Sequence, residues 1–184
     1  FVEKKAKFSV EAENLFIDLK STLGIQTLKG VRILHRYDVS GLTSQEYAIA
    51  RDTIFSEPTV DRVYEENFLL NKGEKCFAME YLPGQYDQRA DSAAQCVQLL
   101  TQKERPEILT AKVIVLEGNV DAKNFVKIKE YCINPVEARE ASMAKPENLS
   151  LLAEVPPNVK QLDGFTDKSH EELCLLRGTL GLAM

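Results

Sequence analysis

Apolar and polar residues alternate along the first 140 positions in an order that predicts two similar sets of strands and helices. The first set is expected as a strand over 1–4, a helix after Ser9, an alternating strand over 31–37, a helix opened by the capping box Thr43–Glu46, and a closing strand over 60–66. Gly24 and Pro58 should end the two helices, because glycine accepts a left-handed cap and proline cannot continue a helix.

The same order of elements returns between 76 and 80 residues later. The matched positions are Phe1 and Phe77, Ala12 and Ala90, Ile33 and Val113, Tyr47 and Phe125, and Pro58 and Pro135. Chance would rarely preserve the order of strands, caps and terminal prolines together. The sequence therefore predicts an internal duplication with copies near 1–70 and 74–140, joined by the polar stretch 71–75.

Each predicted copy is an open strand-helix unit whose sheet needs a second layer. We expect an α+β fold in which two ferredoxin-like units, with antiparallel sheets and helices on one face, pack as a pseudo-twofold pair over residues 1–140. Residues 141–184 are expected to be a linker with a short helix at the capping box Ser169–Glu172. The apolar, uncapped end looks like a cut from a longer protein.

Composition excludes some functions. The 184 residues are 44% hydrophobic and carry a formal charge of −5, which disfavours a nucleic-acid footprint. No apolar run is long enough to span a membrane, and the first residues lack a signal-peptide pattern. The four cysteines, at 76, 96, 132 and 174, lack metal-site spacing. Cys96 and Cys132 fall on predicted apolar helix stripes, so a reducing cytoplasm is expected.

The stretch Tyr81–Cys96 resembles the N-terminal region of large phosphoribosylformylglycinamidine synthases, closest to the single-chain form of clostridia and related bacteria. Residues 31–39, 55–58 and 133–136 are similar to the same family, and the resemblance runs from Phe1 to Met184. In that family the N-terminal domain looks like a fused dimer of a small subunit that other bacteria make separately. The duplication deduced from the offsets agrees with this resemblance.

The resemblance implies an enzyme that converts formylglycinamide ribonucleotide, glutamine, ATP and water to the amidine, glutamate, ADP and phosphate. A synthetase region would use ATP and Mg, and a glutaminase region would use a Cys nucleophile and a His base. This sequence contains neither a Gly-rich phosphate loop nor a nucleophile elbow, so no catalytic residue and no cofactor is assigned to it. It is expected to be a non-catalytic domain that contacts those two regions. Self-association of the fragment is left open.

One segment is a candidate contact site, because polar groups gather around a predicted helix start. The candidate residues are Tyr81, Pro83, Gly84, Gln85, Asp87, Gln88, Arg89, Asp91 and Ser92. The corresponding stretch of the first copy, 5–9, has no such cluster. Three interpretations remain open: an interface, plain helix capping with a local Arg–acid pair, or anion binding at the helix N-terminus.

Two rival functions are also considered. A free-standing regulatory module could bind a small molecule between paired ferredoxin-like units. A Cys-dependent hydrolase would need a Cys and a His in contact, and only His170 and Cys174 are close in sequence. Those two residues could share a helix face, but a metal site would need a third ligand. His35 lies mid-strand on the face of Ile33 and Tyr37, where a hydrogen-bonded structural role is expected.

Overall fold

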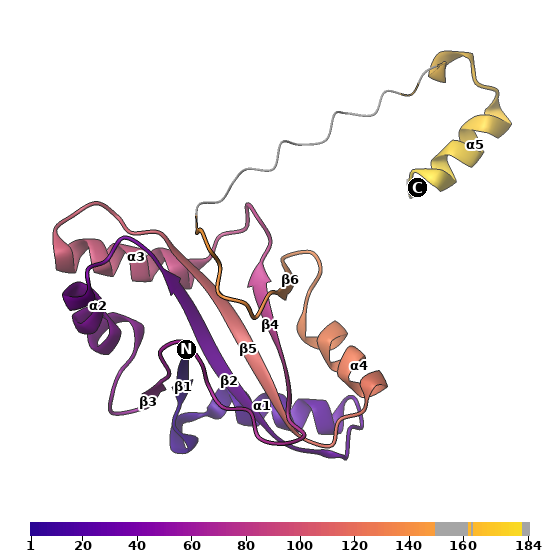
Figure 1. Ribbon diagram of the computed structural model, residues 1–184. Helices are drawn as coiled ribbons and strands as arrows, with labels where there is room; N and C mark the ends of the chain where they lie inside the picture. Colours follow the sequence, from indigo (N-terminus) through magenta and orange to yellow (C-terminus); the bar gives the residue numbers. More distant parts are fainter. Residues whose placement is uncertain (150–161, 163, 182–184) are drawn as a thin grey trace. The chain divides into compact units, whose positions relative to one another are not determined.

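The computed structural model of the chain describes residues 1–149, 162 and 164–181 (Figure 1). The chain divides into two compact units, Phe1–Ser150 and Leu151–Met184, and each is described by itself. The first boundary lies at Ser150 rather than at the expected residue 140. The additional residues include the end of a strand and a segment that contacts the sheet, described below.

A six-stranded antiparallel sheet forms the centre of the first unit, in the order β3-β1-β2-β5-β4-β6 (Figure 1). The strands are β1 (Val2–Lys4), β2 (Leu28–Val39), β3 (Asp61–Val63), β4 (Lys75–Tyr81), β5 (Ile108–Gly118) and β6 (Ala138–Ala141). The expected α+β class with antiparallel pairing is confirmed. The two predicted sheets are joined edge to edge through β2 and β5 into one.

The helices of residues 1–149 cover one face of this sheet. They are α1 (Val10–Ser21), α2 (Ser44–Ala50) with a π-helical turn over Arg51–Phe55, α3 (Gln88–Thr101) and α4 (Ala122–Cys132). Leu19 of α1 and Ile128 of α4 are fully buried in a cluster with Ile33 of β2. Val97 of α3 packs in a second cluster with Ile108 of β5. The predicted placement of helices on one face is therefore confirmed.

The opposite face of the sheet is covered by chain segments instead of helices. Leu34, Val113 and Val115 are buried there, with Phe1 and Phe68 packed over them. The segment between β3 and β4 crosses this face, and the Arg32 guanidinium donates to the Leu69 carbonyl oxygen. The segment after β6 also lies on this face, because Arg36 of β2 donates to the Ser142 carbonyl oxygen.

The strand pairs show the internal duplication directly. Adding 77 to both members of a pair in the first half gives a pair in the second half: Val2–His35 becomes Met79–Lys112, Val2–Val63 becomes Met79–Glu140, and Lys4–Asp61 becomes Tyr81–Ala138. His35 and Lys112 are 77 apart and are also direct partners across β2 and β5. The pseudo-twofold axis therefore passes through the His35–Lys112 pair, because a twofold rotation must exchange the two members of that pair.

The helices follow the same relation with a shift of 78. The helix N-caps Thr43 and Asp121 are 78 apart, as are the left-handed residues Gly24 (φ 71°) and Gln102 (φ 53°) after α1 and α3. The expected offset of 80 for the long strands is wrong, since it would match Ile33 on the helix face with Val113 on the opposite face. Side chains alternate between the two faces of a strand. An offset between the copies is therefore acceptable only if both matched residues point to the same face of the sheet.

Several local predictions differ in detail. Ser9 lies at the N-cap position of α1, but its hydroxyl donates to the Ala6 carbonyl oxygen instead of accepting from the helix. The closing strand of the first copy is only Asp61–Val63. In the second unit, a 3-10 turn (Phe165–Asp167) precedes α5 (His170–Thr179), and the predicted Ser169–Glu172 capping box is present. Residues 150–161 and 163 of the expected linker lie outside the described residues.

Removing the first capping box should cost about 1 kcal/mol of unfolding free energy. The Thr43 hydroxyl accepts from the Glu46 amide at 3.3 Å, and the Glu46 carboxylate accepts from the Thr43 amide at 2.9 Å. Thr43→Ala removes the first of these bonds and leaves a helix-end N–H without its partner. Urea unfolding should show this loss, whereas Ser44→Ala, one residue later, should change stability little. Equal effects of the two substitutions would contradict the capping role.

Candidate functional site

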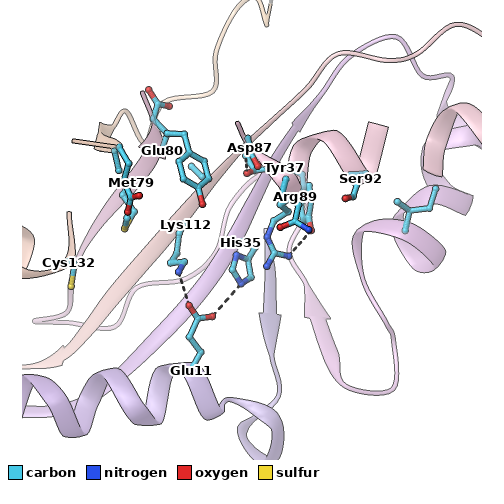
Figure 2. Close-up of a pocket in the computed structure, with 18 of the residues that line it drawn as sticks. Glu11, His35, Tyr37, Met79, Glu80, Asp87, Arg89, Ser92, Lys112 and Cys132 are labelled. Atoms are coloured by element: carbon cyan, nitrogen blue, oxygen red, sulfur yellow. Dashed lines mark hydrogen bonds and ion pairs between the residues drawn. The ribbon is translucent and has the colours of Figure 1, made fainter. Parts of the chain in front are cut away.

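A groove of about 750 Å³ lies on the helix face of the sheet, where the pseudo-twofold axis emerges (Figure 2). Its lining contains three pairs of positions related by the duplication: Glu11 and Arg89, His35 and Lys112, and Ile54 and Cys132. The two halves of the domain therefore build the groove together. The members of each pair differ chemically, so a nearly symmetric backbone carries an asymmetric set of side chains.

The floor of the groove is the cross-strand pair of His35 and Lys112. Glu11, at the start of α1, reaches both of them: its carboxylate accepts from Lys112 Nζ at 2.7 Å, and its other oxygen lies 3.7 Å from His35 Nε2. Figure 2 shows Glu11 below the two floor residues with both contacts dashed. The contact with Glu11 agrees with the expected structural role of His35.

Glu11 makes stability depend on pH. Contact with His35, and then with Lys112, lowers the pKa of Glu11 from 4.5 to about 2, against partial burial, which raises it. A carboxyl whose pKa is lowered by folding contributes stability above its unfolded pKa and loses it as the pH falls through its folded pKa. Between pH 4.5 and pH 2, the unfolding free energy should therefore fall more steeply for the wild type than for Glu11→Gln. Parallel curves would contradict this contribution.

The start of α3 forms one wall of the groove and is fixed to the sheet by side chains. The Asp87 carboxylate accepts from the Ala90 amide at 2.9 Å, as a helix cap does, and from the Thr110 hydroxyl of β5 at 2.6 Å. Arg89 Nη1 donates to the Tyr37 hydroxyl at 3.1 Å. The Asp87 contact is that of a helix cap, and Arg89 contacts a tyrosine hydroxyl where one of the open alternatives placed a nearby acid.

The predicted cluster separates into internal and outward groups. Asp91 faces its own helix and the loop after it: its carboxylate accepts from Arg105, from the Tyr86 hydroxyl at 2.8 Å and from Gln95 at 2.8 Å. Hydrogen bonding to Arg105 is the main cause of the lowered pKa of Asp91.

The other predicted residues divide between the groove and the loop before α3. The predicted residues that line the groove are Tyr81, Asp87, Gln88, Arg89 and Ser92. Pro83, Gly84 and Gln85 are exposed on the loop and do not line it; Gly84 has φ 90°, which favours glycine there.

Sequence reasoning missed the central part of this site. Neither Glu11 nor Lys112 was predicted to belong to a site, and Tyr37 was predicted only to share a strand face with His35. Only the register of β2 against β5 places Lys112 beside His35. The internal duplication was the sequence signal that could have located this site. Two fused copies can build one site together where both face the pseudo-twofold axis.

Two cysteines, Cys96 and Cys132, line this groove. Cys96 is exposed, contrary to the expected apolar stripe, and Cys132 is half-buried, with burial raising its pKa to about 11. A thiol with a raised pKa carries little thiolate and reacts slowly. On α5, Cys174 Sγ lies 3.8 Å from His170 Nε2 with both side chains exposed. Among residues 1–149, 162 and 164–181, no group of three or more His, Cys, Asp or Glu side chains could hold a metal ion.

No family model, curated protein or solved structure matches this chain. Within the described part of the chain, no helix has the length and apolar character needed to cross a bilayer.

Proposed function

We propose that this domain is a non-catalytic interface domain of a phosphoribosylformylglycinamidine synthase, in which it couples the glutaminase to the ATP-dependent synthetase. The proposal starts from the resemblance of Tyr81–Cys96 and the shorter stretches to that family. The chemistry of this C–N ligase, with glutamine as nitrogen donor and with ATP and Mg, would belong to regions outside these 184 residues. The domain would act in the cytoplasm by holding those regions in a productive arrangement.

One structural observation carries the interface role. Within the described residues, the exposed side chains of Gln85, Gln88 and Ser92 have no hydrogen-bond partner, although the loop and helix that carry them are well fixed. Their neighbours Asp87 and Asp91 are satisfied internally. Because the Asp87 contacts already fix the backbone at this helix start, a protein partner would have to order only these side chains and not the helix start itself.

A second candidate is a regulatory module that binds a small molecule, and the groove on the pseudo-twofold axis favours it. The groove volume falls within the range of about 300–1,000 Å³ found for small-molecule sites. The polar residues around the His35–Lys112 floor would supply the specific contacts.

Reconstitution tests the interface proposal. The synthase would be produced without its N-terminal domain, and the 184-residue chain would be added separately. Glutamine-dependent turnover should rise with added chain until it saturates. The chain alone should neither hydrolyse glutamine nor consume ATP. Glutaminase activity of the chain alone, abolished by changing one cysteine, would refute the non-catalytic role.

A further inference from the structure

Arg89 lines the groove and has no acidic partner among the residues that the structure describes. Elsewhere in the first unit, Arg32, Arg36, Arg51, Arg105 and Arg139 each pair with a carboxylate, and Arg62 on the edge strand β3 contacts the Tyr64 hydroxyl. Arg89 instead donates one hydrogen bond, to the neutral Tyr37 hydroxyl. Its remaining N–H donors are available, and a planar guanidinium with free donors is the side chain best suited to bind carboxylate or phosphate in a bidentate manner.

The surroundings of Arg89 reinforce this property. Tyr37 lies two residues from His35 on the same face of β2, and Lys112 is directly opposite His35. Three basic side chains therefore share one end of the groove, where Figure 2 shows Lys112, His35 and Arg89 above Glu11. Two carboxylates lie at this end: Glu11 forms an ion pair with Lys112, and Asp87 accepts from two uncharged donors, the Ala90 amide and the Thr110 hydroxyl.

The other end of the groove has the opposite charge. Glu137 precedes Ala138, whose strand is separated from β2 by β4 and β5. Three strand spacings amount to about 14 Å between β6 and β2. Glu137 disfavours a second anionic group at its own end, whereas Glu80, which also lines the groove, is paired with Arg139. Between the two ends lie Met79 and the half-exposed ring of Tyr81.

We infer that the axial groove binds a small molecule with one anionic head, a phosphate or a carboxylate, held by Arg89, and an uncharged or amino-bearing body lying along Met79 and Tyr81. His35 and Lys112 add hydrogen-bond donors beneath the head. Such a site goes beyond the interface proposed above and does not depend on it, since binding is measured on the 184-residue chain without a partner or turnover.

The test uses matched probes with NMR chemical shifts of the chain as readout. Phenyl phosphate and benzoate each join a phenyl ring to one of the two anionic groups, phosphate or carboxylate. Benzyl alcohol has the same ring but no anionic group. At least one of the two anionic probes should saturate, with a dissociation constant of about 10 mM or below. Its shifts should centre on residues of the groove, and benzyl alcohol should not saturate. The anionic probe with the lower dissociation constant shows whether the groove prefers a phosphate or a carboxylate.

Substitutions then decide the role of Arg89. Arg89→Gln should weaken binding at least about tenfold, the effect of losing a charge-assisted bidentate contact. Arg62→Gln, an exposed arginine on the edge strand β3, should leave it unchanged. Lys112→Gln should also weaken binding and serves as a second variant if Arg89→Gln folds poorly. Failure of both anionic probes to saturate, unchanged binding by Arg89→Gln and Lys112→Gln, or equal binding of benzyl alcohol would overturn the inference.

Discussion

Replacing Phe77 by alanine should lower the free energy of unfolding by about 3–5 kcal/mol, the largest stability loss that we expect from one substitution. Phe77 is 2% exposed on β4 and contacts Phe125 of α4 edge to face, with ring centroids 5.9 Å apart. It lies opposite Ile114 in the ladder between β4 and β5. Deleting the ring would leave a cavity between the sheet and α4, because neighbours on two rigid elements can relax only partly.

Urea unfolding of the whole chain measures this loss. Leu99→Ala is a suitable control, since Leu99 is 77% exposed on α3 and its truncation should change stability by about 0.5 kcal/mol or less. A loss below about 1 kcal/mol for Phe77→Ala would contradict the placement of α4 against β4.

Much of the fold follows from sequence patterns because each copy obeys simple periodicities. Ala90, Ala93, Ala94 and Val97 recur at helical spacing, and all four are buried in α3. The capping signals at Thr43 and Asp121 also correctly predict the starts of α2 and α4. These signals are local, so neighbouring residues suffice to determine them.

The register between the copies could not be predicted in the same way. Offsets of 76 to 80 are all compatible with the sequence pattern, but a shift of one residue turns every side chain of a strand to the other face. Only the pairing of β2 with β5 places His35 beside Lys112 and thereby defines the groove. The cluster at 81–92 was predicted as one site, but Asp91 bonds to its own helix and the loop after it, whereas Asp87, Gln88 and Arg89 line the groove.

The second large effect concerns coupling between the two active regions of the proposed synthase. If Arg89 contacts a partner region, each charge-assisted hydrogen bond lost in Arg89→Ala would remove about 1.5–3 kcal/mol from that interface. Tyr37 holds Arg89 only through a neutral hydroxyl, so no buried acid is left unpaired and the domain itself should remain folded. Glutamine-dependent turnover should fall at least about tenfold, since about 1.4 kcal/mol corresponds to a factor of ten.

A second variant separates docking from ligand binding in the groove. Gln85 is exposed on the loop before α3 and does not line the groove. A bulky Gln85→Trp substitution should therefore block a partner without disturbing Arg89 or the groove floor. If docking is the cause, both variants should lose glutamine-dependent turnover, whereas Arg62→Ala on the distant edge strand should not.

The most direct measurement of the interface role compares glutamine and ammonia as nitrogen sources in these full-length variants. The amide-activating site would be untouched, so supplied ammonia should be used at a near-normal rate while glutamine-dependent turnover falls. Equal losses with both sources would show that the segment supports folding or the synthetase site. Unchanged turnover with both sources would leave helix capping as the role of this segment and would contradict the proposed coupling function.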